Sequence, residues 1–532
     1  MRHFRNILMI GSALALVACG ADDVASPGEG TLVPAPAPSP SPSPTPTPTP
    51  TPGTPATGCA TGFADAGTIG NYRICRIPSS ITADLTIPAR AGTAYQINGR
   101  VDVGIDLGGA ATPNTTGRAA ILTIEPGALI FGNGGDADND FLIVNRGSQI
   151  QAVGTEARPI IFTARENLTA GGVTDTSQGL WGGIILAGRA PISNCNATVA
   201  GGTAGCENTI EGTGNALYGG AVANDSSGRM QYVQIRYSGV AITPNNELQG
   251  LTTAGVGSGT TISHIHIHNS ADDGIEVFGG RVNMRNLVMT GTDDDALDTD
   301  VGHQGAFQFV LAVQRAGNGS SDPRGFEIDS NGSDDALPRN DFRIANYTLV
   351  QRLNSTSVAN SAAIHLRGGT DARLANGVVV HSANSCLNID AASTVRAADA
   401  ALQDNGPPVF NANYFACTLA AGAAAGSTAA FIDDANVTAA QIQAVLTTAP
   451  SSANVLDGTS AGLTGTFITA GPAAAVTPFN ASTMNFTGSG FLVSTNYIGA
   501  VRDANDVWYR FWTCDSGTAN FGSNATCTSL PN

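Results

Sequence analysis

The sequence contains no lysine: all 25 of its basic residues are arginine, and they are outnumbered by 42 acidic residues, which gives a net charge of −17. A lysine nucleophile, a lysine base and a Schiff base are therefore excluded. Because so acidic a chain is repelled by phosphates, we expect no nucleic-acid partner. Charged residues make up only 13% of the chain, whereas glycine occurs 65 times. This composition favours strands and turns over surface helices, which need a charged face.

Long hydrophobic runs are also missing, except for a short one at the N-terminus. Arg2 and Arg5 precede an apolar stretch that is too short to span a bilayer easily and ends just before Cys19. A small residue before this cysteine is typical of a bacterial lipoprotein signal. The sequence therefore predicts a signal peptide over 1–18 and acylation of Cys19. Because glycine and not aspartate follows the cysteine, we expect the lipid anchor in the outer membrane.

A proline-rich segment follows the predicted lipidation site. Prolines alternate with Ala, Ser and Thr from Pro34 to Pro55, which prevents helix formation and sheet pairing and favours extended polyproline II. About 22 residues in this conformation span roughly 70 Å. We therefore predict a stalk over 19–57 that holds the body away from the membrane, exposed at the cell surface.

Cysteine is scarce, and eight cysteines remain once Cys19 is assigned to lipid. An even number in an exported chain favours disulfides, and no CxxC or zinc-ligand spacing is present. Many pairings are possible, but proximity along the chain favours four local bridges: Cys59–Cys75, Cys195–Cys206, Cys386–Cys417 and Cys514–Cys527.

Short β-branched runs recur between Gly, Asn and Asp clusters from about Ile81 to Asn388. Regular strands with repeating turns indicate a solenoid. The segment from His266 to Phe278 aligns without a gap with the segment from Val288 to Asp300, and a looser copy is expected at Asp334–Asp335. The offset between the two aligned segments is roughly the length of one coil of a three-sided parallel β-helix. The coils of such a helix lie about 4.8 Å apart.

The sequence therefore predicts an all-β protein whose body is a parallel β-helix over 58–475. An Ala-rich insertion is expected near 391–475, with one helix over 438–448 that Thr438 caps. Closing strands and a small cap are expected over 476–532, because open solenoid ends need covering.

Several stretches resemble a family of exported bacterial proteins with a pectin-lyase-like right-handed parallel β-helix. They are "LTIEPGALIFG", "FLIVNRGSQIQAVGTEARPIIFTA", "WGGIILAGRAPI", "GRMQYVQIRYSG", "NELQGLTTAGVGSGTTISHIHIHNSADDGIEVFGGRVNMRNL" and "TNYIGA". The resemblance covers about Cys59 to Cys514 and implies the fold. Some members look linked to type II secretion and to TonB-dependent receptors. The resemblance therefore implies a surface lipoprotein with such a receptor, or a polysaccharide, as its partner.

Alternation along the strands places apolar residues inside and two columns of other side chains on one outward face. The first column is predicted to contain Glu276, Asp298, Glu327, His365 and Asn388, and the second Phe278, Asp300, Asp329, Arg367 and Asp390. We expect this acidic face to bind the ligand.

Carboxylates stacked about 4.8 Å apart repel one another unless they share a cation or protons. The oxygen-rich shell of calcium suits such a site, and calcium is the only cofactor expected. The candidate ligands are Asp272, Asp294, Asp298 and Asp300. The repeated pairs Asp272–Asp273 and Asp294–Asp295 also fit solvated turn residues of the scaffold.

Two other metal motifs are incomplete. "DADND" at 136–140 matches the first half of an EF-hand loop but lacks the following Gly and the distal Glu. His264, His266 and His268 alternate along one strand, but the next coil supplies no acid ligand at the equivalent positions. We therefore expect an exposed, solvated row of histidines.

Two classes of function remain open. The first is a non-catalytic surface protein that binds an extended ligand along the acidic face. The alternative is a calcium-dependent polysaccharide lyase or a glycoside hydrolase with Asp298, Glu327 and Arg367 as candidate catalytic residues. The hydrolase motif around His303 is incomplete, since the sequence there is "GHQG". An enzyme predicts a loop-walled groove with converging carboxylates, whereas a binding module predicts an open, flat face.

Overall fold

The computed structural model describes residues 53–531, except 134–138, 244–245, 318–322, 331, 353–361, 421, 435 and 524. The predicted signal peptide, Cys19 and the stalk as far as residue 52 lie outside the described residues, as does the first part of the 136–140 motif. No helix in the described part of the chain is long and apolar enough to cross a membrane.

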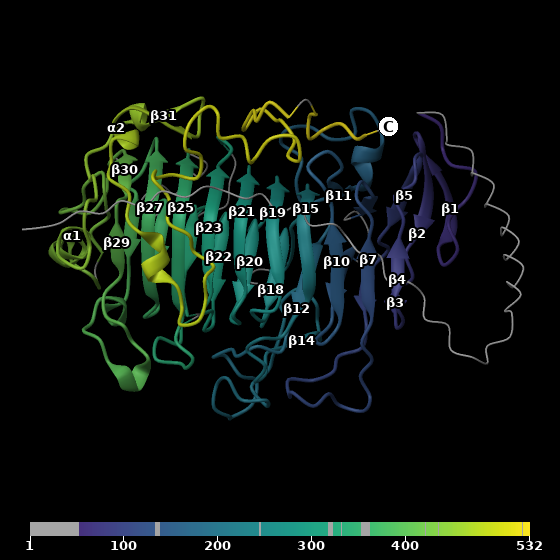
Figure 1. The fold of residues 1–532 in the computed structure, drawn as a ribbon, viewed down its shortest axis with the longest axis horizontal. Coiled ribbons are helices and arrows are strands. Elements are labelled where there is room, and N and C mark those ends of the chain that lie inside the picture. Colours follow the sequence, from purple (N-terminus) through teal and green to yellow (C-terminus); the bar gives the residue numbers. More distant parts are fainter. Residues whose placement is uncertain are drawn as a thin grey trace, which may run out of the picture. The chain divides into compact units, whose positions relative to one another are not determined.

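Two long sheets of mainly parallel strands make up the body, and Figure 1 shows these strands side by side in one row. The larger sheet, sheet A, contains β1 (Ala64–Ile69), β2 (Tyr72–Arg76), β4 (Leu85–Ile87), β5 (Thr93–Gln96), β7 (Ile121–Ile124), β8 (Leu129–Gly132), β10 (Gln149–Val153), β11 (Ile160–Ala164), β15 (Gly228–Arg236), β19 (Thr261–His268), β21 (Asn283–Thr290), β23 (Ala306–Val313), β25 (Asp341–Gln351), β27 (Asp371–His381), β29 (Val409–Asn411) and β30 (Tyr414–Cys417).

Sheet B contains β3 (Ser80–Ile81), β6 (Arg100–Val103), β9 (Phe141–Val144), β12 (Gly183–Ala187), β18 (Leu251–Ala254), β20 (Ile275–Phe278), β22 (Leu297–Asp300), β24 (Phe326–Ile328), β26 (Ile364–Leu366) and β28 (Leu387–Ile389). Three short antiparallel pairs are β13 (Asn208–Thr209) with β14 (Leu217–Tyr218), β16 (Val240–Thr243) with β17 (Asn246–Leu248), and β31 (Leu463–Thr464) with β32 (Ile468–Thr469). The α-helices are α1 (Ala439–Thr447) and α2 (Gly471–Ala474), and the 3-10 helices are η1 (Arg165–Leu168), η2 (Ala392–Thr394), η3 (Ala400–Leu402), η4 (Ser460–Gly462) and η5 (Ala481–Met484).

The predicted parallel β-helix and its register are confirmed. Ile275 of β20 pairs with Leu297 of β22, as the gapless alignment of the two sequence segments requires. The alternate residues Ile275, Val277 and Leu297 are wholly buried in one continuous core. Burial of apolar side chains between successive coils is therefore the main stabilising contribution to the body.

Six long strands of sheet A each bend at a single residue with a left-handed backbone. These residues are Tyr232, His264, Asn286, Phe309, Asn346 and Asn376, with φ between 53° and 59°, and Ala412, with φ 56°, lies between β29 and β30. They occupy one column, because the pairs Ser263–Arg285 and Ile265–Leu287 lie on either side of the bend in neighbouring strands. A left-handed residue with a Cβ is unfavourable, least so for Asn. The bend divides each long strand into two sides of the coil, and sheet B supplies the third.

Different elements cover the two ends of the core. The antiparallel hairpin of β1 and β2 covers the N-terminal end. Helix α1 covers the other end, with Ile442, Val445 and Leu446 buried against the core. This helix confirms the prediction for 438–448, and the Gln441 side chain accepts the Thr438 N–H at 3.0 Å.

The expected closing strands over 476–532 are a wrong prediction, since the described residues of this segment contain η5 and no strand. Instead, residues 463–531, here named the C-terminal strap, run back along the outer face of sheet A (Figure 1, yellow). Side chains of the sheet bind the backbone of the strap: Asn376 donates to the Phe479 carbonyl at 3.0 Å and Gln308 to the Val493 carbonyl at 2.8 Å. These bonds satisfy backbone groups that strand pairing would otherwise have to satisfy.

All four predicted disulfides form, with Cα–Cα distances of 5.5, 4.7, 5.5 and 4.9 Å in chain order. Cys59–Cys75 fixes the N-terminal hairpin, and Cys386–Cys417 joins neighbouring coils near the C-terminal end. Cys195–Cys206 lies in the loop between β12 and β15, and Cys514–Cys527 closes the strap. The bridges therefore tie loops and chain ends to the coils, and Cys75, Cys386, Cys514 and Cys527 are themselves buried in the core.

We expect the α1 cap to contribute strongly to stability. Ile442→Ala should lower the free energy of unfolding by about 2–5 kcal/mol, because it leaves a cavity where the helix meets the core. The measurement is a urea unfolding curve, with the exposed Gln443→Ala as the matched control. Equal urea midpoints for the two variants would show that α1 does not seal the core.

Candidate functional site

The two predicted outward columns exist on sheet B. Backbone pairing places Glu276 next to Asp298, Asp298 next to Glu327, Glu327 next to His365, and His365 next to Asn388. In the second column, Phe278 pairs with Asp300. Asp329, Arg367 and Asp390 continue it, each following its strand directly. Alternation along the strands is therefore sufficient to place all ten residues.

This face is covered, whereas the sequence left open whether it would be flat and exposed. Glu276, Asp300 and Asp329 are each only 7% exposed. Tyr218 of β14, in the segment between β12 and β15, packs with its ring centroid 5.9 Å from that of Phe278. The Arg367 side chain is 41% exposed, so the C-terminal part of the face is the more accessible part.

The turn before each strand joins the face to form one group of carboxylates. Three sets have ligand oxygens that all lie within 4.8 Å of one another: Asp272, Asp273 and Asp294; Asp273, Glu276 and Asp298; Asp295, Asp298 and Glu327. Asp273 and Asp298 each belong to two sets, so we name these seven residues together the acidic cluster. One turn also binds the next, since Asp273 Oδ1 accepts the Asp295 N–H at 2.9 Å.

The predicted calcium ligands are only partly brought together. Asp272 and Asp294 share one set and Asp298 belongs to two others, but Asp300 belongs to none of the sets found among the described residues. The pattern of the sequence did not identify Asp273, Asp295, Glu276 and Glu327 as candidate calcium ligands, because turn residues and strand residues were assigned separate roles. The signal was present, since turn and strand repeat together at one common offset.

The expected third copy of the turn at Asp334–Asp335 is wrong. These residues follow β24 instead of preceding it, and Asp335 forms an ion pair with Arg396. Arg324 takes the next place in the stack, where its N–H donates to Asp295 Oδ1 at 2.6 Å. Asp-rich turns depend on local backbone hydrogen bonds, so similar sequences form at different corners of the coil.

Burial makes ionisation of the acidic cluster costly. Desolvation, followed by the charge of Asp294, raises the pKa of Asp272 to about 8. Desolvation and neighbouring carboxylates also raise the pKa of Asp273, Glu276, Asp295 and Asp298 well above the usual range. Most of these groups therefore hold protons at neutral pH unless a cation replaces them.

Among the described residues, the arginines that contact the cluster lie at its Glu327 end. Burial opposes ionisation of Glu327, but His365, Arg324 and Arg367 together lower its pKa below the usual range. Arg324 Nη1 lies 2.7 Å from Glu327 Oε2, and Arg367 Nη2 lies 3.0 Å from Glu327 Oε1. Within the described part of the chain, Asp273, Glu276 and Asp298 form no ion pair with a basic side chain.

Buried oxygens without a hydrogen-bond donor among the described residues occur in both parts of the cluster, including Glu327 Oε1, but only those of Glu276 and Asp298 also lack an ion pair. Glu276 Oε2 and Asp298 Oδ1 accept no hydrogen bond from any described residue. An unsatisfied buried acceptor destabilises the fold by about 1–3 kcal/mol, and more if it is charged. The set Asp273, Glu276 and Asp298 thus has the charge, the burial and the free oxygens of a cation site.

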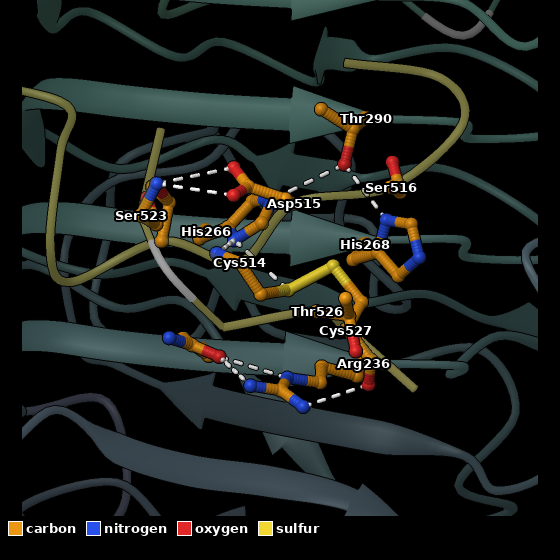
Figure 2. The surroundings of a disulfide bond; sticks show 12 residues. Arg236, His266, His268, Thr290, Cys514, Asp515, Ser516, Ser523, Thr526 and Cys527 are labelled. Atoms are coloured by element: carbon orange, nitrogen blue, oxygen red, sulfur yellow. Dashed lines mark hydrogen bonds between the residues drawn. A yellow bond between two sulfur atoms is a disulfide. The ribbon is translucent and has the colours of Figure 1, made fainter. Parts of the chain in front are cut away.

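The expected exposed histidine row is wrong. His266 and His268 are fully buried beneath the strap, and Figure 2 shows them beside the Cys514–Cys527 disulfide. Both rings contact the Thr290 hydroxyl, at 3.1 and 2.9 Å. Desolvation lowers the pKa of His268 to about 3, so the ring stays neutral and structural. His303 is also buried, with Nε2 3.1 Å from the Val282 carbonyl, and does not belong to the acidic face.

Stacked parallel coils with an acidic outward column define a β-helix protein of the pectate-lyase type. The chain belongs to this family: the model described as the pectate-lyase-like β-helix domain matches residues 110–453. The resemblance seen in the sequence is confirmed. No curated protein and no solved structure matches the chain.

The raised pKa values predict a loss of stability at alkaline pH. Desolvation raises the pKa of Asp300 to about 8, so the folded chain binds a proton that the unfolded chain releases near pH 4. The protonated Asp300 carboxyl makes its full contribution to the free energy of unfolding below pH 4, and this contribution is lost as the pH rises through 8. The buried histidines act in the opposite direction, but only below about pH 6.5.

We therefore expect Asp300→Asn to flatten the fall in melting temperature between pH 6.5 and 8.5, measured by circular dichroism with a chelator present. The exposed Glu156→Gln should keep the wild-type slope. An unchanged slope in Asp300→Asn would show that this carboxyl is already ionised in the folded chain.

Proposed function

We propose that the protein is a surface-exposed outer-membrane lipoprotein that binds an extended ligand and holds calcium in its acidic cluster. The observation that carries the calcium proposal is the set Asp273, Glu276 and Asp298, whose ligand oxygens lie within 4.8 Å of one another without a basic partner among the described residues. Like charges at this distance in a buried place need protons or a shared cation.

Calcium fits this set better than other common ions. It takes six to eight oxygen ligands in flexible geometry, and carboxylates supply up to two each. Magnesium prefers a strict octahedral shell and keeps several waters, which suits a covered site less well. Zinc prefers nitrogen and sulfur ligands, and none of the three sets contains histidine or cysteine.

Binding is favoured over catalysis by the geometry of the candidate catalytic residues. Arg367 is held by Glu327 at 3.0 Å and by Asp329 at 2.9 Å. Burial lowers the pKa of this guanidinium, but the two carboxylates outweigh burial and raise it, so Arg367 keeps its proton and is a poor base.

The ligand is an extended one, a polysaccharide or an outer-membrane receptor of the TonB-dependent kind. In support of this, the side chain of Arg367 in the C-terminal part of the outward face of sheet B is 41% exposed, whereas Glu276, Asp300 and Asp329 of the same face are buried. Bound calcium would fix the Glu276 end of this face and remove its charge repulsion. The acyl chains on Cys19 and the stalk would present the face outside the cell.

Calcium binding is tested by calorimetry on the full chain after removal of metal by a chelator. We expect one calcium ion to bind and to release protons, because the carboxyls are protonated before binding. The free energy of unfolding should rise by about 2.7 kcal/mol at a free calcium concentration 100-fold above Kd. Asp298→Asn should weaken binding by at least about tenfold, since it removes a charged ligand from two sets.

Glu156→Gln, an exposed acid elsewhere, is the matched control and should bind calcium as the wild type does. The calcium proposal is wrong if millimolar calcium changes neither heat nor melting temperature. The non-catalytic proposal is wrong if the protein turns over a uronate polysaccharide and Asp298→Ala abolishes turnover while the fold is retained.

The lipid anchor gives a separate prediction. Cys19→Ser should move the protein from the membrane fraction to the soluble exported fraction, because it removes the site of acylation. The measurement is immunoblotting of separated fractions, with protease treatment of whole cells to test surface exposure. Retention of Cys19→Ser in the outer membrane would mean that the protein is held there by a contact other than lipid.

A further inference from the structure

A cleft of about 590 Å³ lies between the turns that leave sheet B and the C-terminal strap. Three successive coils contribute Ser258, Arg281 and Gln304, and Asn283 follows at the start of β21. Phe486 and Thr487 of the strap form the opposite wall. No residue of the acidic cluster lines the cleft, so it is separate from the proposed calcium site.

Among the described residues that line this cleft, Arg281 is the only charged one. Its Nη1 donates to the Gly280 carbonyl at 2.9 Å and to the Gly302 carbonyl at 3.4 Å, which leaves Nε and Nη2 without a partner among the described residues. Desolvation lowers its pKa to about 10, and Asp341 opposes this only in part. Within the described chain Arg281 forms no ion pair, and Asp341 is bound by Arg343 at 2.6 Å. The cleft therefore carries one uncompensated positive charge.

The other polar groups of the cleft are neutral and offer both donors and acceptors. Asn283 Oδ1 accepts the Ala306 N–H at 2.9 Å, which leaves its amide N–H groups for a ligand. Gln304 Nε2 donates to the Arg339 carbonyl at 2.9 Å, which leaves its oxygen as an acceptor. The hydroxyl groups of Ser258 and Thr487 act as hydrogen-bond donors or as acceptors. This mixture suits a ligand with several hydroxyl groups.

Phe486 supplies an apolar wall and is fixed in place. The guanidinium carbon of Arg343 lies 3.5 Å from its ring centroid, a close cation–π contact. The Met484 carbonyl also accepts from Arg343 Nη1 at 2.8 Å, so Arg343 holds both the ring and the backbone two residues before it. The cleft is thus a preformed space of the size usual for small ligands.

We propose that this cleft binds a small hydroxy-carboxylate, with its carboxylate on Arg281 and its hydroxyls on Asn283, Gln304 and Thr487. A planar guanidinium edge matches the two oxygens of a carboxylate. A single positive charge balances one negative charge, and the net charge of −17 disfavours ligands of higher charge such as phosphate dianions. The inference does not depend on calcium or on the lipid anchor.

The test compares two probes that differ only at one end, D-gluconate and the neutral D-glucitol, by calorimetry on the full chain. Gluconate should bind at least about tenfold more tightly, because only it forms the charge-assisted pair. Arg281→Gln should reduce the affinity for gluconate to that for glucitol, while circular dichroism shows that the fold is retained. The exposed Arg229→Gln is the matched control and should bind as the wild type does.

A second variant keeps the proposal testable if Arg281→Gln does not fold. Thr487→Val removes a hydroxyl group from the exposed rim of the strap. It should weaken gluconate binding a few-fold, which corresponds to the net free energy of one hydrogen bond. Equal affinity for the two probes, or no binding of gluconate, overturns the proposal. Displacement of gluconate by an equal concentration of sulfate also overturns it, because the cleft would then be a general anion site.

Discussion

Backbone hydrogen bonding in register between successive coils is the constraint on which the rest of the molecule depends. Each paired residue lies directly beside its partner one coil later, so a residue type that recurs at the same position is stacked on itself. Where the repeated residue is apolar, as at Ile275 and Leu297, the result is a continuous core. Where it is acidic, as at Glu276 and Asp298, the same register forces carboxylates together and raises their pKa values. The register between successive coils thus produces both the apolar core and the acidic cluster.

The parts of the structure that follow from this register were accessible from the sequence. The pairing of the two aligned coils, the inward and outward alternation and both columns of the acidic face need only the repeat and the strand periodicity. Helix α1 was also predictable, because its cap and its apolar positions are local signals. The disulfides followed from proximity along the chain, which works where a bridge closes a short loop.

The rest depends on contacts between residues distant in sequence, which leave no periodic signal. Nothing local to His266 and His268 shows that a segment near the C-terminus covers them. Nor does the sequence show that Tyr218 lies over Phe278, or that Asp273 of a turn meets Glu276 and Asp298 of two strands. The strap replaces strand pairing by side-chain bonds from Asn376 and Gln308, and such bonds carry no β-pattern. Tertiary contact therefore decided which candidate residues came together.

The strap also constrains the order in which the chain can fold. Its last residues lie against the first coils: the Tyr72 hydroxyl donates to the Pro531 carbonyl at 2.9 Å, and Asn167 donates to the Cys527 carbonyl at 3.2 Å. Coils can stack as they emerge, since each needs only its neighbour. The outer face of sheet A, with Val288 and Leu311, stays exposed until Tyr509 and Trp512 arrive. A chain interrupted near its end would therefore present a finished core with an uncovered apolar side, a state prone to aggregation.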